Sequence, residues 1–141
     1  MSWIDKDFPN MVGLHQITSE ADTAYNCIGW AATGQKSEWW QHTPGYRWPG
    51  PNRSSVIESL VSVFVSLRYE QRPASETSVE AGYEKIALYA RNGFWTHAAR
   101  QLPNGKWTSK LGEDEDIEHD SAECICGIKY GTVHCIMRRK L

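Results

Sequence analysis

The sequence predicts an α+β domain in which helices pack on a C-terminal antiparallel sheet of about four strands. Apolar residues recur at helical spacing between residues 55 and 70, whereas short β-prone runs separated by turn residues begin at Tyr83. The helical pattern therefore lies in the first half of the chain and the strand pattern in the second. That segregation is typical of α+β folds and not of alternating α/β folds.

The length and composition indicate one domain over residues 1–141. Hydrophobic residues make up 40% of the chain and the net charge is −2, which supports an ordinary core and argues against nucleic-acid binding. The longest apolar run, residues 61–67, is too short for a bilayer, and the N-terminus lacks the pattern of a signal peptide. We expect a cytoplasmic protein, or one exported without a signal peptide, that does not bind membranes.

A short helix is predicted over residues 28–33. Asn26 suits the N-cap and Gly34 the C-terminal stop, which makes Cys27 the first residue of this helix. A helix N-terminus lowers the pKa of a thiol and directs backbone N–H groups at a developing negative charge. Cys27 is therefore a candidate nucleophile, and the alternative is a small buried side chain.

Two polar segments connect the predicted elements. Residues 41–54 are too rich in proline for a helix or a central strand. We expect this tract to line one side of a cleft over Cys27, with Tyr46 and Trp48 as apolar walls; the alternative is a surface loop whose aromatic side chains pack against the sheet. Residues 71–80 are expected to be a dispensable connection.

The regular elements after residue 54 follow from local signals. The motif Ser55-x-x-Glu58 is a capping box and predicts the start of an amphipathic helix over about residues 55–70. Asn92-Gly93 and the loop at Pro103 separate β-prone runs. The expected strands are residues 85–90, 94–102, 106–111 and 131–137.

The loop Pro103-Asn104-Gly105 predicts the register of one hairpin. A type I turn with Gly105 in the left-handed position pairs Leu102 with Lys106. This register places four side chains on one face: His97, Ala99, Trp107 and Ser109. Ser109 then lies diagonal to His97, whereas a two-residue Asn-Gly loop would put Lys110 there instead. His97 is a candidate base, and the alternative is a buried structural histidine.

The cysteines are expected to be free thiols. Without a secretory signal the chain is expected in a reducing compartment. Cys124 and Cys126, with His134-Cys135 and His119, offer a possible metal site. Structural zinc sites space paired ligands by two to four residues, so we expect no metal and assign these cysteines to the core.

The block Tyr25-Asn26-Cys27-Ile28-Gly29-Trp30 resembles the nucleophile block of CHAP-type and NlpC-type amidases. A cysteine at a helix start, followed by a histidine on an antiparallel strand, resembles the papain-like cysteine hydrolases. The chain is also similar to a family of small uncharacterised bacterial proteins. The resemblance implies a papain-like fold, with a nucleophile helix and one amphipathic helix on the sheet.

A papain-like enzyme would use these residues to cleave, or to transfer an acyl group from, an amide or thioester. The Cys27 thiolate would attack the carbonyl, His97 would carry the proton, and Ser109 would orient the imidazole. The backbone N–H of Cys27, helped by Tyr25, would stabilise the oxyanion. Four aromatic residues are expected to contact a peptide or other amide substrate: Trp30, Tyr46, Trp48 and Trp107. The chemistry requires no cofactor.

Two alternatives remain at this point. A serine cannot stabilise imidazolium as a carboxylate does, so the acidic run at residues 113–116, Glu118 or His119 could supply the third catalytic member. The second alternative is a catalytically inactive papain-like module, associated with immunity or toxins, that binds a partner protein. Its recognition surface would be the aromatic side chains of Trp39, Trp40, Tyr46 and Trp48.

Overall fold

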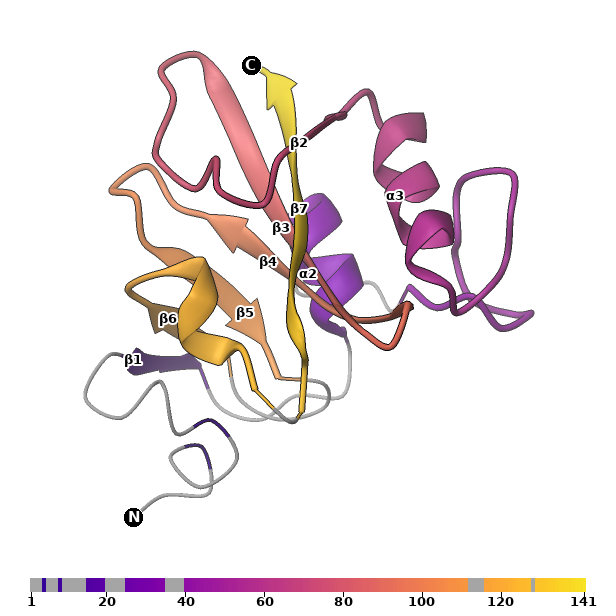
Figure 1. Ribbon diagram of the computed structural model, residues 1–141, viewed down its shortest axis with the longest axis horizontal. Helices are drawn as coiled ribbons and strands as arrows, with labels where there is room; N and C mark the ends of the chain where they lie inside the picture. Colours follow the sequence, from indigo (N-terminus) through magenta and orange to yellow (C-terminus); the bar gives the residue numbers. More distant parts are fainter. Residues whose placement is uncertain are drawn as a thin grey trace.

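The computed structural model describes residues 4, 8, 15–19, 25–34, 40–111, 116–127 and 129–141. Seven of the strands in these residues form one antiparallel sheet in the order β1-β6-β5-β4-β3-β7-β2 (Figure 1). The strands are β1 (His15–Ser19), β2 (Glu70–Arg72), β3 (Tyr83–Arg91), β4 (Phe94–Gln101), β5 (Trp107–Lys110), β6 (Asp116–His119) and β7 (Thr132–Lys140).

The papain-like expectation is wrong. The described chain is mostly sheet, with two short α-helices, α2 (Cys27–Thr33) and α3 (Ile57–Ser66), and a 3₁₀ turn, η2 (Ala122–Ile125). The four expected strands exist as β3, β4, β5 and β7, but β1, β2 and β6 extend the sheet. These three strands have only three to five residues, which is too short for a convincing alternation of apolar and polar side chains.

Helix α2 forms as its local sequence predicts. The Asn26 side chain accepts a hydrogen bond from the Gly29 N–H at 3.0 Å, and Gly34 ends the helix in the left-handed conformation at φ 65°. Asn26 also binds the backbone of Trp40 at both its N–H and its carbonyl. One side chain thus caps the helix and fixes the chain that follows it.

Helix α3 begins later than predicted, and the Ser55 capping box does not form. The N-cap residue is Val56, which forms a β-bridge with Phe94. The Ile57 N–H donates to the Gly93 carbonyl at 2.9 Å, so the β3–β4 hairpin satisfies a backbone donor that a capping side chain would otherwise take. A tertiary contact therefore sets the start of this helix.

The two hairpins agree with their turn sequences. Asn92 and Gly93 both have positive φ, as a two-residue type I′ turn requires. In the next hairpin Gln101 pairs with Trp107, and the Leu102 N–H donates to the Lys106 carbonyl. The register predicted from the loop after Leu102 is confirmed.

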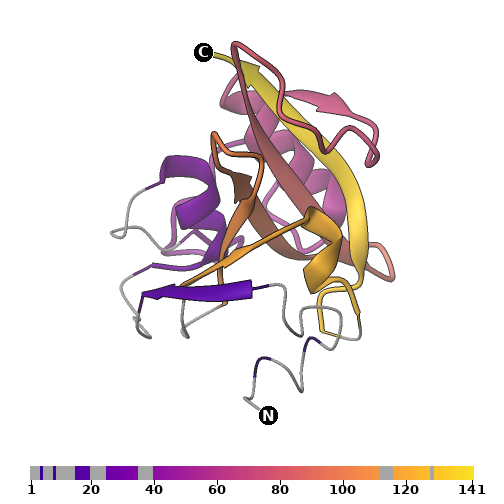
Figure 2. The ribbon, with the colours of Figure 1, turned by 90° about the vertical axis from the view of Figure 1, so that its left-hand side faces the viewer.

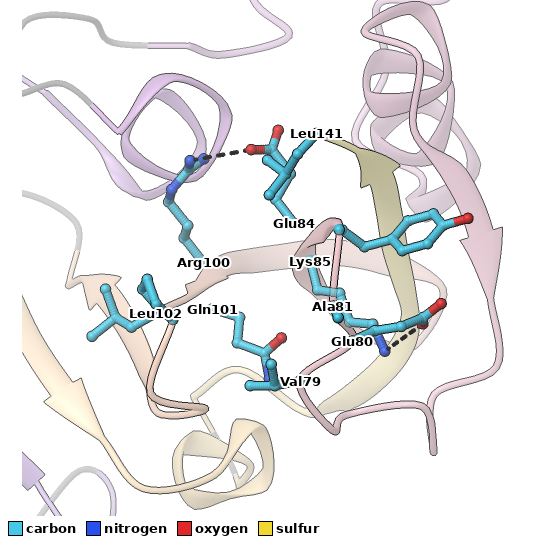
Figure 3. A pocket seen from close by; sticks show the side chains of 12 residues that line it. Val79, Glu80, Ala81, Glu84, Lys85, Arg100, Gln101, Leu102 and Leu141 are labelled. Carbon is cyan, nitrogen blue, oxygen red and sulfur yellow. Dashed lines mark ion pairs between the residues drawn. The ribbon is translucent and has the colours of Figure 1, made fainter.

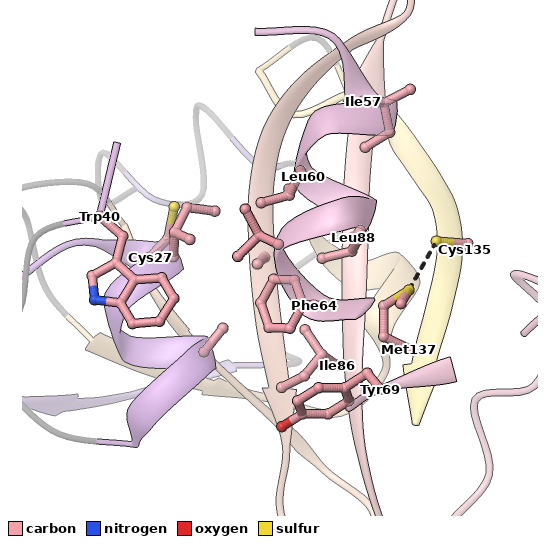
Figure 4. Close-up of a cluster of buried hydrophobic side chains, with 14 of the residues drawn as sticks. Cys27, Trp40, Ile57, Leu60, Phe64, Tyr69, Ile86, Leu88, Cys135 and Met137 are labelled. Atoms are coloured by element: carbon pink, nitrogen blue, oxygen red, sulfur yellow. Dashed lines mark hydrogen bonds between the residues drawn. The ribbon is translucent and has the colours of Figure 1, made fainter. Parts of the chain in front are cut away.

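Buried side chains form one cluster on each face of the sheet. We call the cluster under α2 and α3 the helix-side core (Figure 4); it consists of Cys27, Ile28, Ala31, Trp40, Trp48, Ile57, Leu60, Val63, Phe64, Tyr69, Ile86, Leu88, Ala98, Cys135 and Met137. The far-side core lies under η2 and consists of Ile4, Phe8, Ala87, Tyr89, Ala99, Trp107, Leu111, Ile117, Ala122, Cys124, Ile125, Tyr130 and Ile136. Figure 2 shows α2 and η2 on opposite sides of the strands.

None of the helices in the described residues is long and apolar enough to cross a membrane.

Candidate functional site

Cys27 is the first residue of α2, as predicted, but its thiol is buried. The side chain is 8% exposed and belongs to the helix-side core. Burial raises the pKa of the Cys27 thiol to about 11, and the opposing backbone N–H groups, chiefly that of Ala98, do not offset it. The thiol is therefore protonated at neutral pH, the opposite of an activated nucleophile.

His97 is fully buried on β4 among aromatic side chains. Its ring stacks on Tyr130 at a centroid distance of 4.2 Å and an angle of 7°, and Tyr89 lies 5.4 Å away. Among the described residues, neither ring nitrogen has a hydrogen-bond partner. Burial, with a smaller contribution from nearby His119, holds the pKa of His97 well below its usual value, so the ring is neutral.

The structure does not bring Cys27 and His97 together. Successive side chains on a strand point to opposite faces of the sheet. Ala98 packs with Cys27 in the helix-side core, whereas the neighbouring His97 contacts Tyr89 and Tyr130 of the far-side core. The sheet itself separates the predicted nucleophile from the predicted base.

Ser109 lies on the same face as His97 but its hydroxyl binds another histidine. Its Oγ is 2.8 Å from Nε2 of His119 on β6. The second ring nitrogen of His119 donates to the Ser121 carbonyl at 2.8 Å, so in the neutral ring Nε2 accepts from the Ser109 hydroxyl. Ser109 and His119 are both fully buried, which makes this pair an internal link between β5 and the turn after β6.

Tyr25, the predicted oxyanion donor, is also engaged elsewhere. Its hydroxyl donates to Asp116 at 2.5 Å, and the Lys110 ammonium lies 4.5 Å from the centre of its ring. All three side chains are buried. They connect the start of α2 to β5 and β6, and sequence reasoning missed this group because Asp116 lies in an acidic run that is typical of a loop.

The four predicted substrate contacts do not form a common surface. Trp48 is 5% exposed, stacks on Trp95 at 5.6 Å and belongs to the helix-side core, while Trp107 belongs to the far-side core. Trp30 is half-buried and Tyr46 is 45% exposed. The alternative for residues 41–54, a loop that packs its aromatic side chains inward, therefore holds for Trp48.

The remaining candidate residues do not share one location. Trp40 and Cys135 belong to the helix-side core, and half-buried Cys126 packs against the far-side core. Cys124 is buried beside Ser121, with a sulfur-to-oxygen distance of 3.1 Å. Within the described residues, no group of three or more histidine, cysteine or acidic side chains could hold a metal ion. Trp39 and residues 113–115, considered for recognition and catalysis, lie outside the described residues.

A pocket of about 360 Å³ opens instead at the start of β3 (Figure 3). Its apolar walls come from Val79, Ala81, Leu102, Pro103 and Leu141, and its other lining residues are Glu80, Gly82, Tyr83, Glu84, Lys85, Arg100 and Gln101. Sequence reasoning missed this pocket because its walls come from three separate segments. No local motif marks it, and residues 79–80 lie in the stretch treated as a connection.

The charged groups of the pocket pair with one another. Lys85 contacts Glu80 at 3.3 Å, and Arg100 contacts Glu84 at 3.6 Å. Lys85 also donates to the carbonyls of Glu76 and Ser78, which ties the segment before β3 to the sheet. The pocket thus has apolar walls and a charge-balanced rim, and its shape is held by hydrogen bonds.

The model of a family whose description is a domain of unknown function matches residues 16–138. No curated protein and no solved structure matches the chain.

Proposed function

Because the chain belongs to the family described as Domain of unknown function (DUF7689), we propose a function from its own geometry: it is a binding module that holds an apolar group of a ligand in the pocket at the start of β3. The pocket itself is the observation that supports this proposal. A concave, mostly apolar hollow with a few placed polar groups is the usual form of a small-molecule site.

The walls and rim of the pocket suit an apolar group. Val79, Leu102 and Leu141 present hydrocarbon from three separate segments, as Figure 3 shows. Transfer of apolar surface from water to such walls contributes about 25 cal/mol per Å². The ion pairs at the rim are already made, so a ligand does not have to desolvate an unpaired charge to enter.

The proposal does not include a bond-breaking step. The described residues that line the pocket include no cysteine, serine, threonine or histidine, and their carboxylates and cations are held in ion pairs. The predicted thiol-hydrolase mechanism needs Cys27 and His97 in contact, and these residues lie on opposite faces of the sheet. The geometry therefore favours binding over catalysis.

The test measures the binding of an uncharged probe with an apolar chain, 1-octanol, before and after a substitution that fills the pocket. We expect 1-octanol to shift the backbone amide resonances of residues 79–85 and 100–102 in NMR spectra. Ala81→Phe places a ring in the pocket and should weaken octanol binding at least about tenfold, which corresponds to 1.4 kcal/mol. Thr132→Phe adds the same ring at the exposed start of β7 and should leave binding unchanged.

Two results would overturn the proposal. One is an absence of octanol-dependent shifts at the pocket residues in the folded wild-type protein. The other is equal octanol affinity of Ala81→Phe and the wild type.

A further inference from the structure

A second hollow, of about 330 Å³, lies beside the proposed pocket. It is lined by Arg68, Tyr69, Glu70, Tyr83, Arg138 and Lys140. Tyr83 lines both hollows, so they are neighbours at the start of β3. We refer to this second hollow as the cationic hollow.

The two hollows differ in charge. The lining of the cationic hollow has three cations and one carboxylate, which gives a net charge of +2. The lining of the apolar pocket has two cations, Lys85 and Arg100, and two carboxylates, Glu80 and Glu84, which cancel. A ligand that extends from one hollow to the other would therefore contact apolar side chains at one end and an excess of positive charge at the other.

Two of the cations are available to a ligand. Within the described residues, the side chains of Arg68 and Lys140 are exposed and have no ion-pair partner. Arg138 differs, because Glu70 and Glu80 both bind its guanidinium, which lies 4.6 Å from the centre of the Tyr83 ring. Arg138 thus forms a fixed wall, and Arg68 and Lys140 supply the unneutralised charge.

The backbone conformation of Arg68 belongs to the end of α3. Arg68 has φ 73°, a left-handed conformation directly after α3 where glycine is the usual residue. This conformation costs an ordinary residue about 1 kcal/mol. The Arg68 N–H donates to the Val65 carbonyl and the Tyr69 N–H donates to the Phe64 carbonyl, so the left-handed residue completes the C-terminal cap of α3. This cap fixes the position from which the Arg68 side chain lines the cationic hollow.

We propose that the ligand is a small amphiphile whose anionic oxygen group, a carboxylate or phosphate, binds Arg68 and Lys140 while its apolar chain occupies the neighbouring pocket. This inference rests on the proposed function and names its ligand class. Arginine and lysine both bind such groups through charge-assisted hydrogen bonds. The apolar chain provides affinity, and the charged group selects the ligand.

The experiment compares probes that differ only in the head group. We expect octanoate to bind about tenfold more tightly than 1-octanol at low ionic strength, and the difference to shrink as salt is added. The double variant Arg68→Gly, Lys140→Gln should bind octanoate about as weakly as octanol, with octanol affinity unchanged. Arg91→Gln removes an exposed cation at the opposite end of β3 from both hollows and should change neither affinity.

The choice of Arg68→Gly separates binding from folding. Glycine relieves the left-handed strain, so this variant should be at least as stable as the wild type while it loses octanoate affinity. Octyl phosphate in place of octanoate then tells which head group is preferred. The inference is supported if either anionic probe binds the wild type more tightly than octanol does and if this difference disappears in the double variant.

The failures of the two proposals are distinguishable. If octanol binds and Ala81→Phe blocks it, but octanoate and octyl phosphate bind no more tightly than octanol, the anionic ligand class is wrong and the apolar site stands. If octanoate binds with the same affinity to Ala81→Phe and the wild type, the apolar site is wrong and this inference fails with it.

Discussion

Cys126 and Cys27 differ in solvent exposure. Cys126 is half-buried, whereas Cys27 is buried and has a pKa of about 11. We therefore expect iodoacetamide at pH 7.5 to modify Cys126 first and to reach Cys27 only after denaturation, as read by mass spectrometry of peptides. Cys126→Ser should remove the fast reaction. Rapid labelling of Cys27 in the native protein would restore it as a candidate nucleophile.

His97 should make stability depend on pH. Burial lowers its folded-state pKa below the ordinary 6.5, while Tyr89, Tyr130 and His119 face the ring. As the pH falls, His97 is therefore protonated in the unfolded chain before it is protonated in the folded protein. Its full contribution to the free energy of unfolding is present above about pH 6.5, and below that pH the free energy of unfolding falls by up to about 1.4 kcal/mol per pH unit. Denaturation of His97→Phe between pH 5 and 8 should show a shallower slope. A slope equal to wild type would assign the dependence to another group.

At the scale of the elements, the residue before β7, Gly131, has to be a glycine. A Cβ added to Gly131, which has φ 74°, would lie 2.1 Å from the Ala90 carbonyl oxygen of β3. We expect Gly131→Ala to lower the free energy of unfolding by about 3 kcal/mol or more, in urea titrations. Gly45 also has positive φ but open space around it, so Gly45→Ala should cost only about 1 kcal/mol. Equal costs would mean that β3 and β7 are not in such close contact at Gly131.

At the scale of the whole molecule, the two cores share one sheet. Ile86 and Ala87 are neighbours on β3, and each belongs to a different core. We expect Leu60→Ala in the helix-side core and Ile117→Ala in the far-side core each to destabilise the protein by about 2–5 kcal/mol. Because the strands are common to both cores, each variant should still unfold in one transition, with near-UV and far-UV circular dichroism coinciding. Separate transitions would show that the cores fold independently.

Local chemistry alone determined several features of this protein. Asn26 sets the start of α2 and Gly34 sets its end. The loop after Leu102 sets the register of the β4–β5 hairpin. Both follow from local sequence because caps and tight turns depend on residues only a few positions apart. The same register correctly places Ser109 on the face of His97. These predictions required no knowledge of distant contacts.

Only the tertiary structure decided where these elements meet. The contact of α2 with Ala98 places Cys27 on the face opposite His97, and the β3–β4 hairpin, not Ser55, starts α3. Strand β6 forms within an acidic run because β1 and β5 pair with it on both sides. The apolar pocket likewise combines residues 79–85 and 100–103 with Leu141. Local sequence specifies what each segment can form, but the face it covers depends on contacts between segments far apart in the chain.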